Sequence, residues 1–400
     1  MTWVTEWAPE RAELDQCIDC ALCLPFCPTF RLTGDEAASP RGRLTAMRAV
    51  AAGVCGVDDR FAGMMDMCLQ CRACEAVCPS LVPFGRVMEG ARAEVAAQHP
   101  TSRSITRRYL FGRLIAIRWI VHLASAVLAV AQRVGLSRRL PGPGRRASGL
   151  RKVPLPVPAT VGRRWMPEGE PIGTVALFSG CVMDPWFSSV HAALVQVLRT
   201  AGYRVDAPSG QTCCGALAAH EGAAYDAARM ARRNVEAFAG YEMIVVDAAG
   251  CGAHLKDYAA DFAGRIVDAN ELVARLLDEG DLPEGDEIVG KVAVQDPCHL
   301  RHAQGLFEEP RRVLRAAGYE PVEIDPRAMC CGAAGAYMLD HPGVSDELGR
   351  AKADQVRATG LSSVASANPG CEMQLRSHLG DGFRVAHPVE LYSEWLASHL

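Results

Sequence analysis

Two patterns of hydrophobic and polar positions divide the chain, and the first has helical spacing. Within residues 39–53 the apolar positions recur three or four residues apart, which places them on one helix face. They are Leu44, Met47, Val50 and Ala51. Ser39 is a helix-capping residue type, Pro40 suits the first helical position, and Gly53 is a typical stop signal. We therefore expect an amphipathic helix here, in a region built from helices rather than from short strands.

The second pattern begins near residue 171, where short apolar runs alternate with helix-like segments. The runs are TVALFSGC, YRVDAP, EMIVVDAAGC, KVAVQDPC, YEPVEIDPRAMCC and SSVASANPGC. The helix-like segments include FSSVHAALVQVLRTAG, which stops at Gly202, and a stretch near 221–240. Strands that alternate with helices are typical of a parallel sheet. The fold class predicted for this half is α/β, with two tandem βαβ-type modules at residues 171–285 and 286–400.

The region between these patterns is apolar and carries many arginines. RRYLFGRLIAIRWIVHLASAVLAVAQR, residues 107–133, predicts a helix, and Arg118 and His122 share one of its faces. Its longest stretch free of Lys, Arg, Asp and Glu has 14 residues, Trp119 to Gln132, whereas a spanning helix needs about 20. The Pro/Gly-rich segments LPGPGRRASG and VPLPVPATVG follow and predict a linker. We therefore expect a helical domain at 1–100 and a basic helix with its linker at 101–170.

Charge distribution adds a candidate contact surface to this division. The 400 residues are 22% charged and 49% hydrophobic, with a net charge of −4, which is ordinary for a globular protein of two or three domains. From Thr101 to Lys152, however, there are twelve Lys or Arg and no Asp or Glu. Basic residues beside an apolar face favour peripheral membrane contact through residues 105–135, or packing against an acidic protein surface. Both alternatives stay open, and no nucleic-acid partner is expected.

Seventeen cysteines are too many and too regularly spaced for structural thiols alone. The N-terminal segment MTWVTEWAPERAELDQ has neither the basic start nor the apolar run of a signal peptide. The number is odd, and the spacings are those of metal ligands rather than of a disulfide framework. We therefore expect a cytoplasmic chain whose thiolates bind metal, with association at the inner face of the membrane if residues 105–135 contact lipid.

Eight of the cysteines form a repeated run that reads C-x2-C-x2-C-x3-C-P. The copies are CIDCALCLPFCP and CLQCRACEAVCP, the second displaced by 51 residues from the first. The predicted ligands are Cys17, Cys20, Cys23, Cys27, Cys68, Cys71, Cys74 and Cys78. This run is typical of bacterial ferredoxins and predicts two [4Fe-4S] clusters. A pair of zinc sites is the alternative, but zinc gives no reason for the proline after each fourth cysteine.

The fourth cysteine of each run is expected to bind the other run's cluster, as in two-cluster ferredoxins. Cys17, Cys20 and Cys23 then share a cluster with Cys78. Cys68, Cys71 and Cys74 share the other with Cys27. Because the residues between the runs have a helix pattern, the domain is predicted to be a helical ferredoxin.

Eight further cysteines form a second repeat, in the α/β half. They are Cys181, Cys213, Cys214 and Cys251, then Cys298, Cys330, Cys331 and Cys371. The displacement is 117 residues for the first three positions and 120 for the last. Adjacent cysteines make a strained disulfide, but successive side chains reach different metal atoms, and the glycine after each pair lets the backbone approach. Because the carboxyl ends of parallel strands meet at one edge, each module is expected to bind an iron–sulfur cluster or zinc with four thiolates.

Several residues near these cysteines have less specific interpretations. His299, beside Cys298, is either an extra ligand or proton relay or a surface histidine, and we favour the surface position. Asp184, Asp247 and Asp296 are explained by helix capping or turn formation as readily as by metal binding. Cys55, the seventeenth cysteine, is expected to be a free, semi-buried thiol. No nucleotide-binding G-x-G-x-x-G fingerprint occurs, and we assign no catalytic residue to the chain.

The order of two ferredoxin runs and two CCG modules resembles the iron–sulfur subunit of glycolate oxidase. The resemblance is carried by CPTFRLTGDEAASPRGR, CLQCRACEAVCPSLVPFG, the GC at Cys181, CCGA, DPCHL and CCGAAGAY. It covers essentially the whole chain and is least specific in the basic middle. It implies an electron-transfer subunit, with partner FAD subunits that oxidise a 2-hydroxy acid such as glycolate to glyoxylate. This chain would then pass the electrons singly toward a quinone or another acceptor.

The same architecture implies alternatives. One is the small subunit of an anaerobic glycerol-3-phosphate dehydrogenase, or a lactate dehydrogenase relay. Another is a catalytic thiol or cluster protein like heterodisulfide reductase, whose module ends in C-x2-C and holds a non-cubane cluster with five thiolates. Here each copy ends in a single cysteine, in GCGAH and GCEMQ, which argues against that cluster. A structural zinc protein is the remaining alternative.

Overall fold

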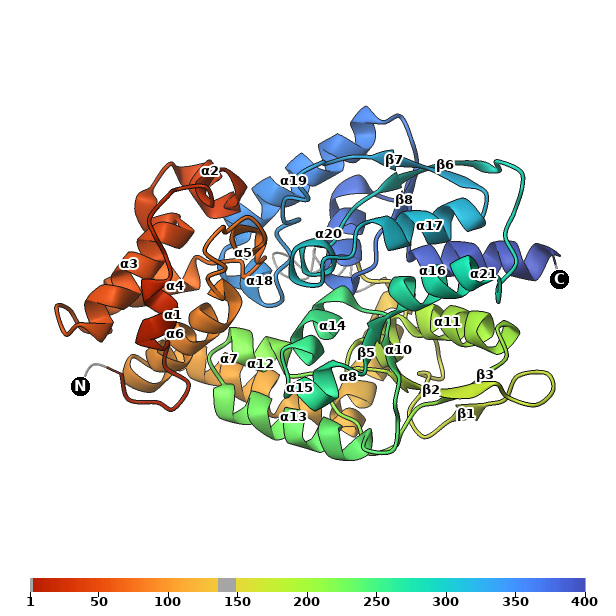
Figure 1. Ribbon diagram of the computed structural model, residues 1–400, viewed down its shortest axis with the longest axis horizontal. Helices are drawn as coiled ribbons and strands as arrows, with labels where there is room; N and C mark the ends of the chain where they lie inside the picture. Colours follow the sequence, from red (N-terminus) through yellow and green to blue (C-terminus); the bar gives the residue numbers. More distant parts are fainter. Residues whose placement is uncertain (1–2, 136–148, 400) are drawn as a thin grey trace.

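The computed structural model describes residues 3–135 and 149–399, and its N-terminal part is built from helices (Figure 1). They are α1 (Arg11–Asp15), α2 (Pro28–Thr33), α3 (Pro40–Ala51), α4 (Asp59–Asp66), α5 (Ala73–Ala76) and α6 (Phe84–Gln98), with 3₁₀ turns η1 (Leu24–Phe26) and η2 (Glu36–Ala38). The helix expected at 39–53 is confirmed as α3, where the Ser39 hydroxyl accepts a hydrogen bond from the Gly42 amide at 2.9 Å. Leu44, Met47 and Val50 are buried against α1, α4 and α6.

The basic segment contains two helices, so the expectation of one continuous helix was wrong. α7 (Ser102–Gly112), the 3₁₀ turn η3 (Leu114–Ala116) and α8 (Arg118–Arg133) follow one another, and the two α-helices meet at 100°. A Cβ at Gly112 would lie 2.7 Å from Asp226 Oδ2, so a larger residue would have to displace the Asp226 side chain where α7 ends against the first module. Within residues 3–135 and 149–399 no single helix is long and apolar enough to span a membrane, although this bent pair passes by length and composition.

The first module is a five-stranded sheet with the order β1-β3-β2-β4-β5. Its strands are β1 (Arg164–Trp165), β2 (Gly173–Phe178), β3 (Tyr203–Asp206), β4 (Ile244–Val246) and β5 (Ile266–Asp268). Its helices are α10 (Met183–Trp186), α11 (Ser188–Thr200), α12 (Ala216–His220), α13 (Ala224–Ala237), α14 (Ala249–Lys256), α15 (Ala260–Ala263) and α16 (Ala269–Glu279). All strands are parallel except β1, which the predicted linker adds antiparallel to β3. Most of LPGPGRRASG lies outside the described residues, whereas VPLPVPATVG is described and contains no helix or strand.

The second module repeats this topology without the edge strand, in the order β7-β6-β8-β9. Its strands are β6 (Gly290–Val294), β7 (Tyr319–Glu323), β8 (Ser363–Ala365) and β9 (Arg384–Ala386), all parallel. Its helices are the π-helical turn η6 (His299–Ala303), α17 (Glu308–Ala316), α18 (Tyr337–Asp340), α19 (Pro342–Ala358), α20 (Pro369–Leu379) and α21 (Pro388–His399). The fold is therefore mixed α/β with parallel sheets. The exact domain boundaries at 100, 170 and 285 stay predictions.

A layer of four helices joins the two modules. α11 and α16 of the first module and α17 and α21 of the second lie between the two sheets (Figure 1). Their apolar side chains form one core, which includes Leu194, Leu272, Val313, Val389 and Tyr392, each fully buried or nearly so. Since burial of one such side chain contributes about 1.5–3 kcal/mol, this shared core fixes the modules relative to each other.

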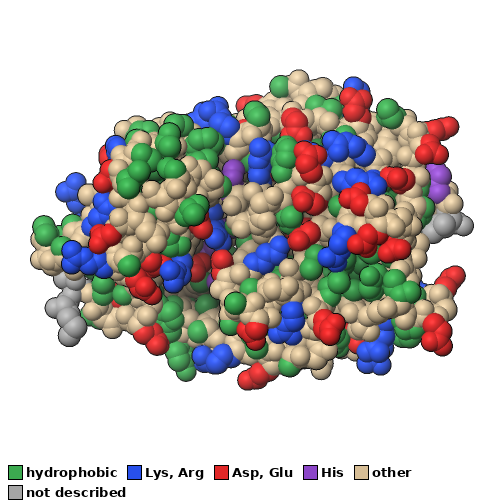
Figure 2. Space-filling model, in the orientation of Figure 1, with side chains coloured by type: hydrophobic (Ala, Val, Ile, Leu, Met, Phe, Trp, Pro, Cys, Tyr) green, Lys and Arg blue, Asp and Glu red, His purple; other side chains and the backbone are tan. Residues whose placement is uncertain are grey.

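Arginines of the basic segment pair with carboxylates of the modules. Arg107 contacts Glu221 and Asp340, Arg113 lies 3.7 Å from Asp226, and Arg118 lies 3.7 Å from Asp184. Elsewhere Lys, Arg, Asp and Glu are interspersed over the face shown in Figure 2. Much of the positive charge is therefore used to hold the segment against the chain's own acidic body, which was one of the alternatives left open.

Arg151 is the most highly paired of these arginines. Its guanidinium donates to both carboxylate oxygens of Glu372 at 2.6 Å, and to those of Glu390 at 2.5 and 2.7 Å. Burial alone would lower the pKa of Arg151, but the hydrogen bonds to both glutamates raise it. The linker is thereby tied to α20 and α21.

Arg151→Gln is expected to lower the free energy of unfolding by about 3 kcal/mol, because it leaves two largely buried carboxylates without their cation. Equilibrium denaturation of the purified chain measures this effect. The neighbouring Lys152 is exposed, so Lys152→Gln is the matched control and should change stability by less than about 0.5 kcal/mol. Equal stability of the two variants would contradict the role given to Arg151.

Candidate functional site

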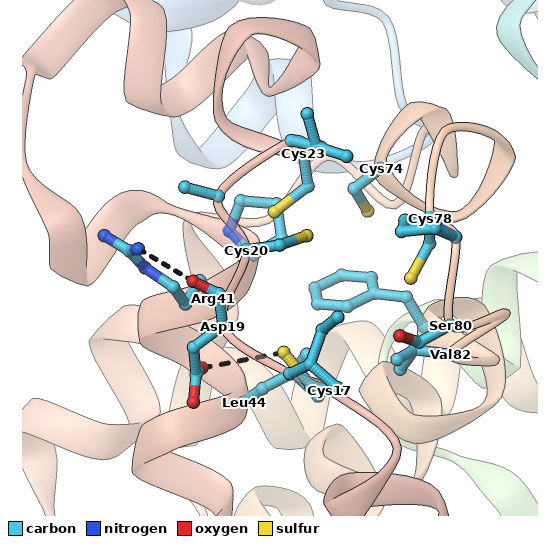
Figure 3. Close-up of a pocket in the computed structure, with 16 residues that line it drawn as sticks. Cys17, Asp19, Cys20, Cys23, Arg41, Leu44, Cys74, Cys78, Ser80 and Val82 are labelled. Carbon is cyan, nitrogen blue, oxygen red and sulfur yellow. Dashed lines mark hydrogen bonds between the residues drawn. The ribbon is translucent and has the colours of Figure 1, made fainter.

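The cysteines of the first run surround a cavity together with cysteines of the second (Figure 3). The lining includes Cys17, Cys20, Cys23, Cys74 and Cys78, with Leu44, Val82 and Phe84 behind them. Figure 3 shows the cysteine sulfur atoms arranged around one common space. Cys20 is exposed, so this cavity lies at the molecular surface.

A second cavity contains the other cysteines of this domain. It is lined by Cys27, Cys68, Cys71 and Cys74, and all four side chains are buried. The fourth cysteine of each run thus lies with cysteines of the other run, since Cys78 lines the first cavity and Cys27 the second. Cys74 borders both. This arrangement is the one that exchanged ligands require, while the assignment of ligands to each cluster stays a prediction.

Four residues in the left-handed backbone region shape the two loops. Asp19 and Ala21 flank Cys20, with φ of 55° and 66°. Gln70 and Arg72 flank Cys71 at the equivalent positions of the second run, with φ of 51° and 60°. A non-glycine residue in this region costs about 1–2 kcal/mol. In both loops, therefore, the rest of the fold must offset this conformational cost at two residues so that the backbone can wrap around the cysteine side chains. The Gln70 amide also donates to Cys68 Sγ at 3.3 Å.

The thiols of this domain need a cation to ionise together. Burial raises the pKa of Cys23 to about 11. Burial also raises the pKa of Cys71 and Cys74, and the charges of neighbouring cysteines add to the effect. Thiolate ligands therefore require positive charge at the centre of each cavity, which iron in a cluster would supply. The two cavities share Cys74 and are lined together by eight cysteine thiols, four for each centre, which fits that group.

In each α/β module the four predicted cysteines come together beyond the carboxyl ends of the strands. Side-chain hydrogen bonds connect Cys181 to Cys213, Cys213 to Cys214 and Cys214 to Cys251. The second module has the same series of hydrogen-bonded thiols, which runs from Cys298 to Cys330, Cys331 and Cys371. The Sγ atoms of Cys331 and Cys371 are 3.3 Å apart. The two cysteines that are adjacent in sequence form the middle of each series of thiols.

The hydrogen bonds lower the pKa of one thiol in each module. Those from Cys181 and Cys214 lower the pKa of Cys213, and those from Cys330 and Cys371 lower the pKa of Cys331. The same bonds raise the pKa of Cys181, Cys214, Cys330 and Cys371. Each module supplies four thiols, the number that a four-thiolate centre needs. In the described residues, however, no group of three or more His, Cys, Asp or Glu side chains is placed to hold a single metal ion.

The second module lies directly against the buried ferredoxin cavity. Cys71 packs in one apolar cluster with Cys298, Cys330 and Tyr337. His299 Nε2 lies 3.0 Å from the Gln70 carbonyl oxygen, so our preference for a surface histidine was wrong. His299 is half-buried where the two parts meet.

The other residues singled out in the sequence have structural partners. Asp184 Oδ1 accepts the Thr160 amide at 2.7 Å, and Asp247 pairs with His191 at 2.5 Å. Asp296 accepts from Arg311 at 2.9 Å. Cys55 is exposed, not semi-buried as expected, because the loop between α3 and α4 leaves the helical core after Gly53.

Three buried or half-buried groups between the cysteine sites were missed. His220 Nε2 and His254 Nδ1 lie 3.6 and 3.9 Å from Glu89 Oε1, and the rings of His220 and His299 stack with centroids 6.0 Å apart. Burial lowers the pKa of His254 to about 4 and raises that of Glu89 to about 8. His254 follows Cys251 by three residues on one helix, which was a usable signal. Glu89 had none, since only the folded chain brings α6 to α12 and α14.

Comparison with known proteins gives matches over nearly the whole chain. The family described as "4Fe-4S dicluster domain" matches residues 13–82, and "Cysteine-rich domain" matches residues 175–256 and 292–376. The chain is 32% identical to the "Probable glycolate oxidase iron-sulfur subunit" of Bacillus subtilis and 31% identical to the "Glycolate oxidase iron-sulfur subunit" of Escherichia coli. Each alignment covers 96% of this chain and 94% of the relative. A subunit of the fumarate reductase (CoM/CoB) of Methanothermobacter marburgensis is 32% identical over 52% of this chain and 43% of its own length.

If the fourth cysteine of each run binds the other run's cluster, certain pairs of cysteine substitutions should alter the same EPR signal. Cys27→Ser and Cys68→Ser should alter one EPR signal of the reduced chain, whereas Cys78→Ser and Cys17→Ser should alter the other. Each of these variants should lose up to about four iron atoms per chain. Cys55→Ser, at an exposed thiol outside both cavities, is the control and should leave both signals unchanged. If Cys27→Ser instead altered the same signal as Cys17→Ser, each run would hold its own cluster.

Proposed function

The chain belongs to the family of glycolate oxidase iron–sulfur subunits, and from this premise we propose that it transfers electrons within a flavin-dependent 2-hydroxy-acid dehydrogenase complex. FAD-containing partner subunits oxidise a 2-hydroxy acid such as glycolate. This chain carries the electrons, one at a time, to a quinone. Its own residues perform no step on the 2-hydroxy acid.

The observation that carries the proposal is the pair of neighbouring cysteine cavities, one exposed and one buried. In this proposal the exposed cavity holds a [4Fe-4S] cluster bound by Cys17, Cys20, Cys23 and Cys78. The buried cavity holds a second cluster, bound by Cys27, Cys68, Cys71 and Cys74. Since Cys74 borders both cavities, the two clusters are adjacent, and electrons pass from the surface inward.

Electrons enter at the exposed cavity. Ile18 and Leu22, on either side of Cys20, are exposed, and so is Leu81, which follows the second run. Apolar side chains around a redox site are suited to contact with a partner protein, because aromatic and aliphatic contacts form the centre of such interfaces. We assign this surface, Ile18–Leu22–Leu81, to docking of the flavoprotein.

The cysteines of the two α/β modules bind further metal centres in this proposal, an iron–sulfur cluster or a zinc ion in each. Support comes from the two series of hydrogen-bonded thiols, one in each module, each made of four buried or half-buried cysteines. In the second module, Cys298 and Cys330 of this series pack against Cys71. A cluster there would extend the relay, whereas zinc would hold the three loops together.

The chain is proposed to work in the cytoplasm, at the inner face of the cell membrane, with residues 105–135 in contact with lipid. One face of α8 presents Trp119, Leu123, Val127 and Val130 to the outside, and Trp119 is 68% exposed. An amphipathic helix with an exposed tryptophan is typical of the membrane interface. Since several arginines of this segment pair internally, apolar contact contributes more than charge.

Electron entry through the exposed surface predicts that Leu81→Asn slows reduction of the clusters by the flavoprotein and 2-hydroxy acid. Leu81 has a φ of 53°, a conformation that asparagine tolerates, so the loop should keep its shape. A loss of about 1.4 kcal/mol in docking raises the apparent KM for the flavoprotein about tenfold. Stopped-flow absorbance of the clusters measures the rate.

The matched control is Val54→Asn. Val54 and Leu81 are each 80% exposed, but Val54 lies in the α3–α4 loop away from the cysteine cavities. Equal kinetics for the two variants would contradict docking at this surface. Clusters that the flavoprotein and substrate never reduce in the wild-type complex would contradict the proposed function.

Membrane contact predicts that the double variant Trp119→Ser, Leu123→Ser no longer sediments with vesicles. The wild-type chain should sediment with vesicles of phosphatidylcholine and phosphatidylglycerol, because exposed apolar residues of α8 enter the lipid interface. Ile288→Ser, at a residue 74% exposed outside α8, is the control and should bind like the wild type. A different pair of results would assign α8 to a partner subunit instead. The wild-type chain would stay in the supernatant, and the double variant would lose only its binding to the flavoprotein.

A further inference from the structure

A cavity of about 320 Å³ lies between four parts of the molecule: the helices of the ferredoxin domain, α7 of the basic segment, α12 of the first module and α18 of the second. Its outer part is bordered by Ala62, Gly63 and Met65 of α4, by Val95 of α6 and by Ser104 of α7. A second, much smaller cavity of about 10 Å³ shares Arg92, Arg107 and His341 with it and is lined by Cys68, Leu69 and Tyr337. Only shared side chains therefore separate the larger cavity from a cysteine assigned to the buried cluster.

The charges that line this cavity are already paired. Arg92 donates to the carbonyl oxygens of Met65, Cys68 and His220, at 3.0, 2.7 and 2.6 Å. Arg107 contacts Glu221 and Asp340. Because both cations are satisfied by the protein, the cavity suits an uncharged ligand better than an anion.

Two histidines on its wall lie beside carboxylates that reach solvent. His341 Nε2 is 2.9 Å from Asp66 Oδ2, and His99 Nε2 is 2.7 Å from Asp59 Oδ1. The side chains of Asp66 and Asp59 are 51% and 97% exposed. Histidine is the side chain best suited to proton exchange near neutral pH. The cavity thus combines an apolar side, formed by α4 and α6, with polar groups and two histidines that have access to water, and it adjoins the cavity that Cys68 lines.

We propose that this cavity binds the headgroup of the quinone that accepts the electrons, an inference that rests on the proposed function. A quinone headgroup is planar, uncharged and mostly apolar, with two carbonyl oxygens that accept hydrogen bonds. α7 connects the cavity to the proposed membrane surface, because Ser104 and Arg107 line the cavity while Ile105 and Tyr109 of the same helix are exposed. The cavity and the segment proposed to contact the membrane therefore meet on α7.

The reaction in the cavity consumes two electrons and two protons. Cys68 would help to hold the cluster nearest to this cavity, and that cluster would supply the electrons one at a time. The two carbonyl groups of the quinone become hydroxyl groups as each oxygen gains a proton from His341 or His99. Water returns these protons to the histidines, and hydroquinone leaves.

Gly63→Leu tests the assignment, since a side chain at this position enters the cavity. A Cβ at Gly63 would meet no atom within 4 Å, and leucine suits the interior of α4 better than glycine, so the variant should fold. In the complete complex with a 2-hydroxy acid, the KM for a water-soluble naphthoquinone should rise at least tenfold. Reduction of ferricyanide, which takes electrons at the exposed cluster, should not change.

Gly56→Leu is the matched control, because Gly56 also has open space around its Cβ but lies in the α3–α4 loop outside the cavity. It should behave like the wild type with both acceptors. Equilibrium dialysis of the naphthoquinone against the cluster-loaded chain gives a second readout, independent of the flavoprotein. Binding to the wild type that Gly63→Leu weakens at least tenfold supports the assignment.

The outcomes separate this inference from the proposed function. Unchanged naphthoquinone kinetics and binding in Gly63→Leu would overturn the acceptor site while electron transfer to ferricyanide still supports the relay. A wild-type complex that reduces ferricyanide but neither binds nor reduces the naphthoquinone would also overturn it. A complex that reduces neither acceptor would contradict the proposed function, and the dialysis result would then decide the cavity's ligand by itself.

Discussion

The interleaving of the two cysteine runs is the constraint on which the rest of the structure depends. Cys78 lies in the cavity of the first run and Cys27 in that of the second, so neither loop is complete alone. Burial and mutual repulsion make these thiols poor anions without a cation. The chain nevertheless holds left-handed residues on both sides of Cys20 and Cys71. Such strain persists only where the surrounding structure over-determines it, here through the helical core.

The duplicated modules extend this centre instead of forming a separate unit. Their shared helix layer fixes the sheets so that the strand ends of the second module face the buried cavity, where Cys298 and Cys330 pack with Cys71. Basic residues of the middle segment hold the assembly together by pairing with both modules, as Arg107 does with Glu221 and Asp340. The apolar face of α8 stays exposed as a consequence, since the paired side of the helix is turned inward.

Sequence reasoning succeeded where the determinants are local. The sequence correctly predicted the helix of α3 from its capping signals and the strands from their apolar runs, and the cysteines of each repeat lie close together in the folded chain, while their roles as ligands stay predictions. It failed where long-range contacts decide. α7 ends at Gly112 where the Asp226 side chain of another helix lies close, and the half-buried His299 contacts the Gln70 carbonyl, 229 residues away in sequence. Glu89 of α6 lies in the site without any sequence signal, because its histidine neighbours come from two other helices, α12 and α14.

The central claim is that the ferredoxin domain holds two iron–sulfur clusters. The direct measurement is the iron and acid-labile sulfide content of the full chain, purified without oxygen, together with EPR of its reduced form. The account predicts about eight iron atoms and as many sulfides per chain, or about twelve or sixteen if the α/β modules hold clusters too. Zinc without acid-labile sulfide would contradict it, because no electron could then pass along the chain.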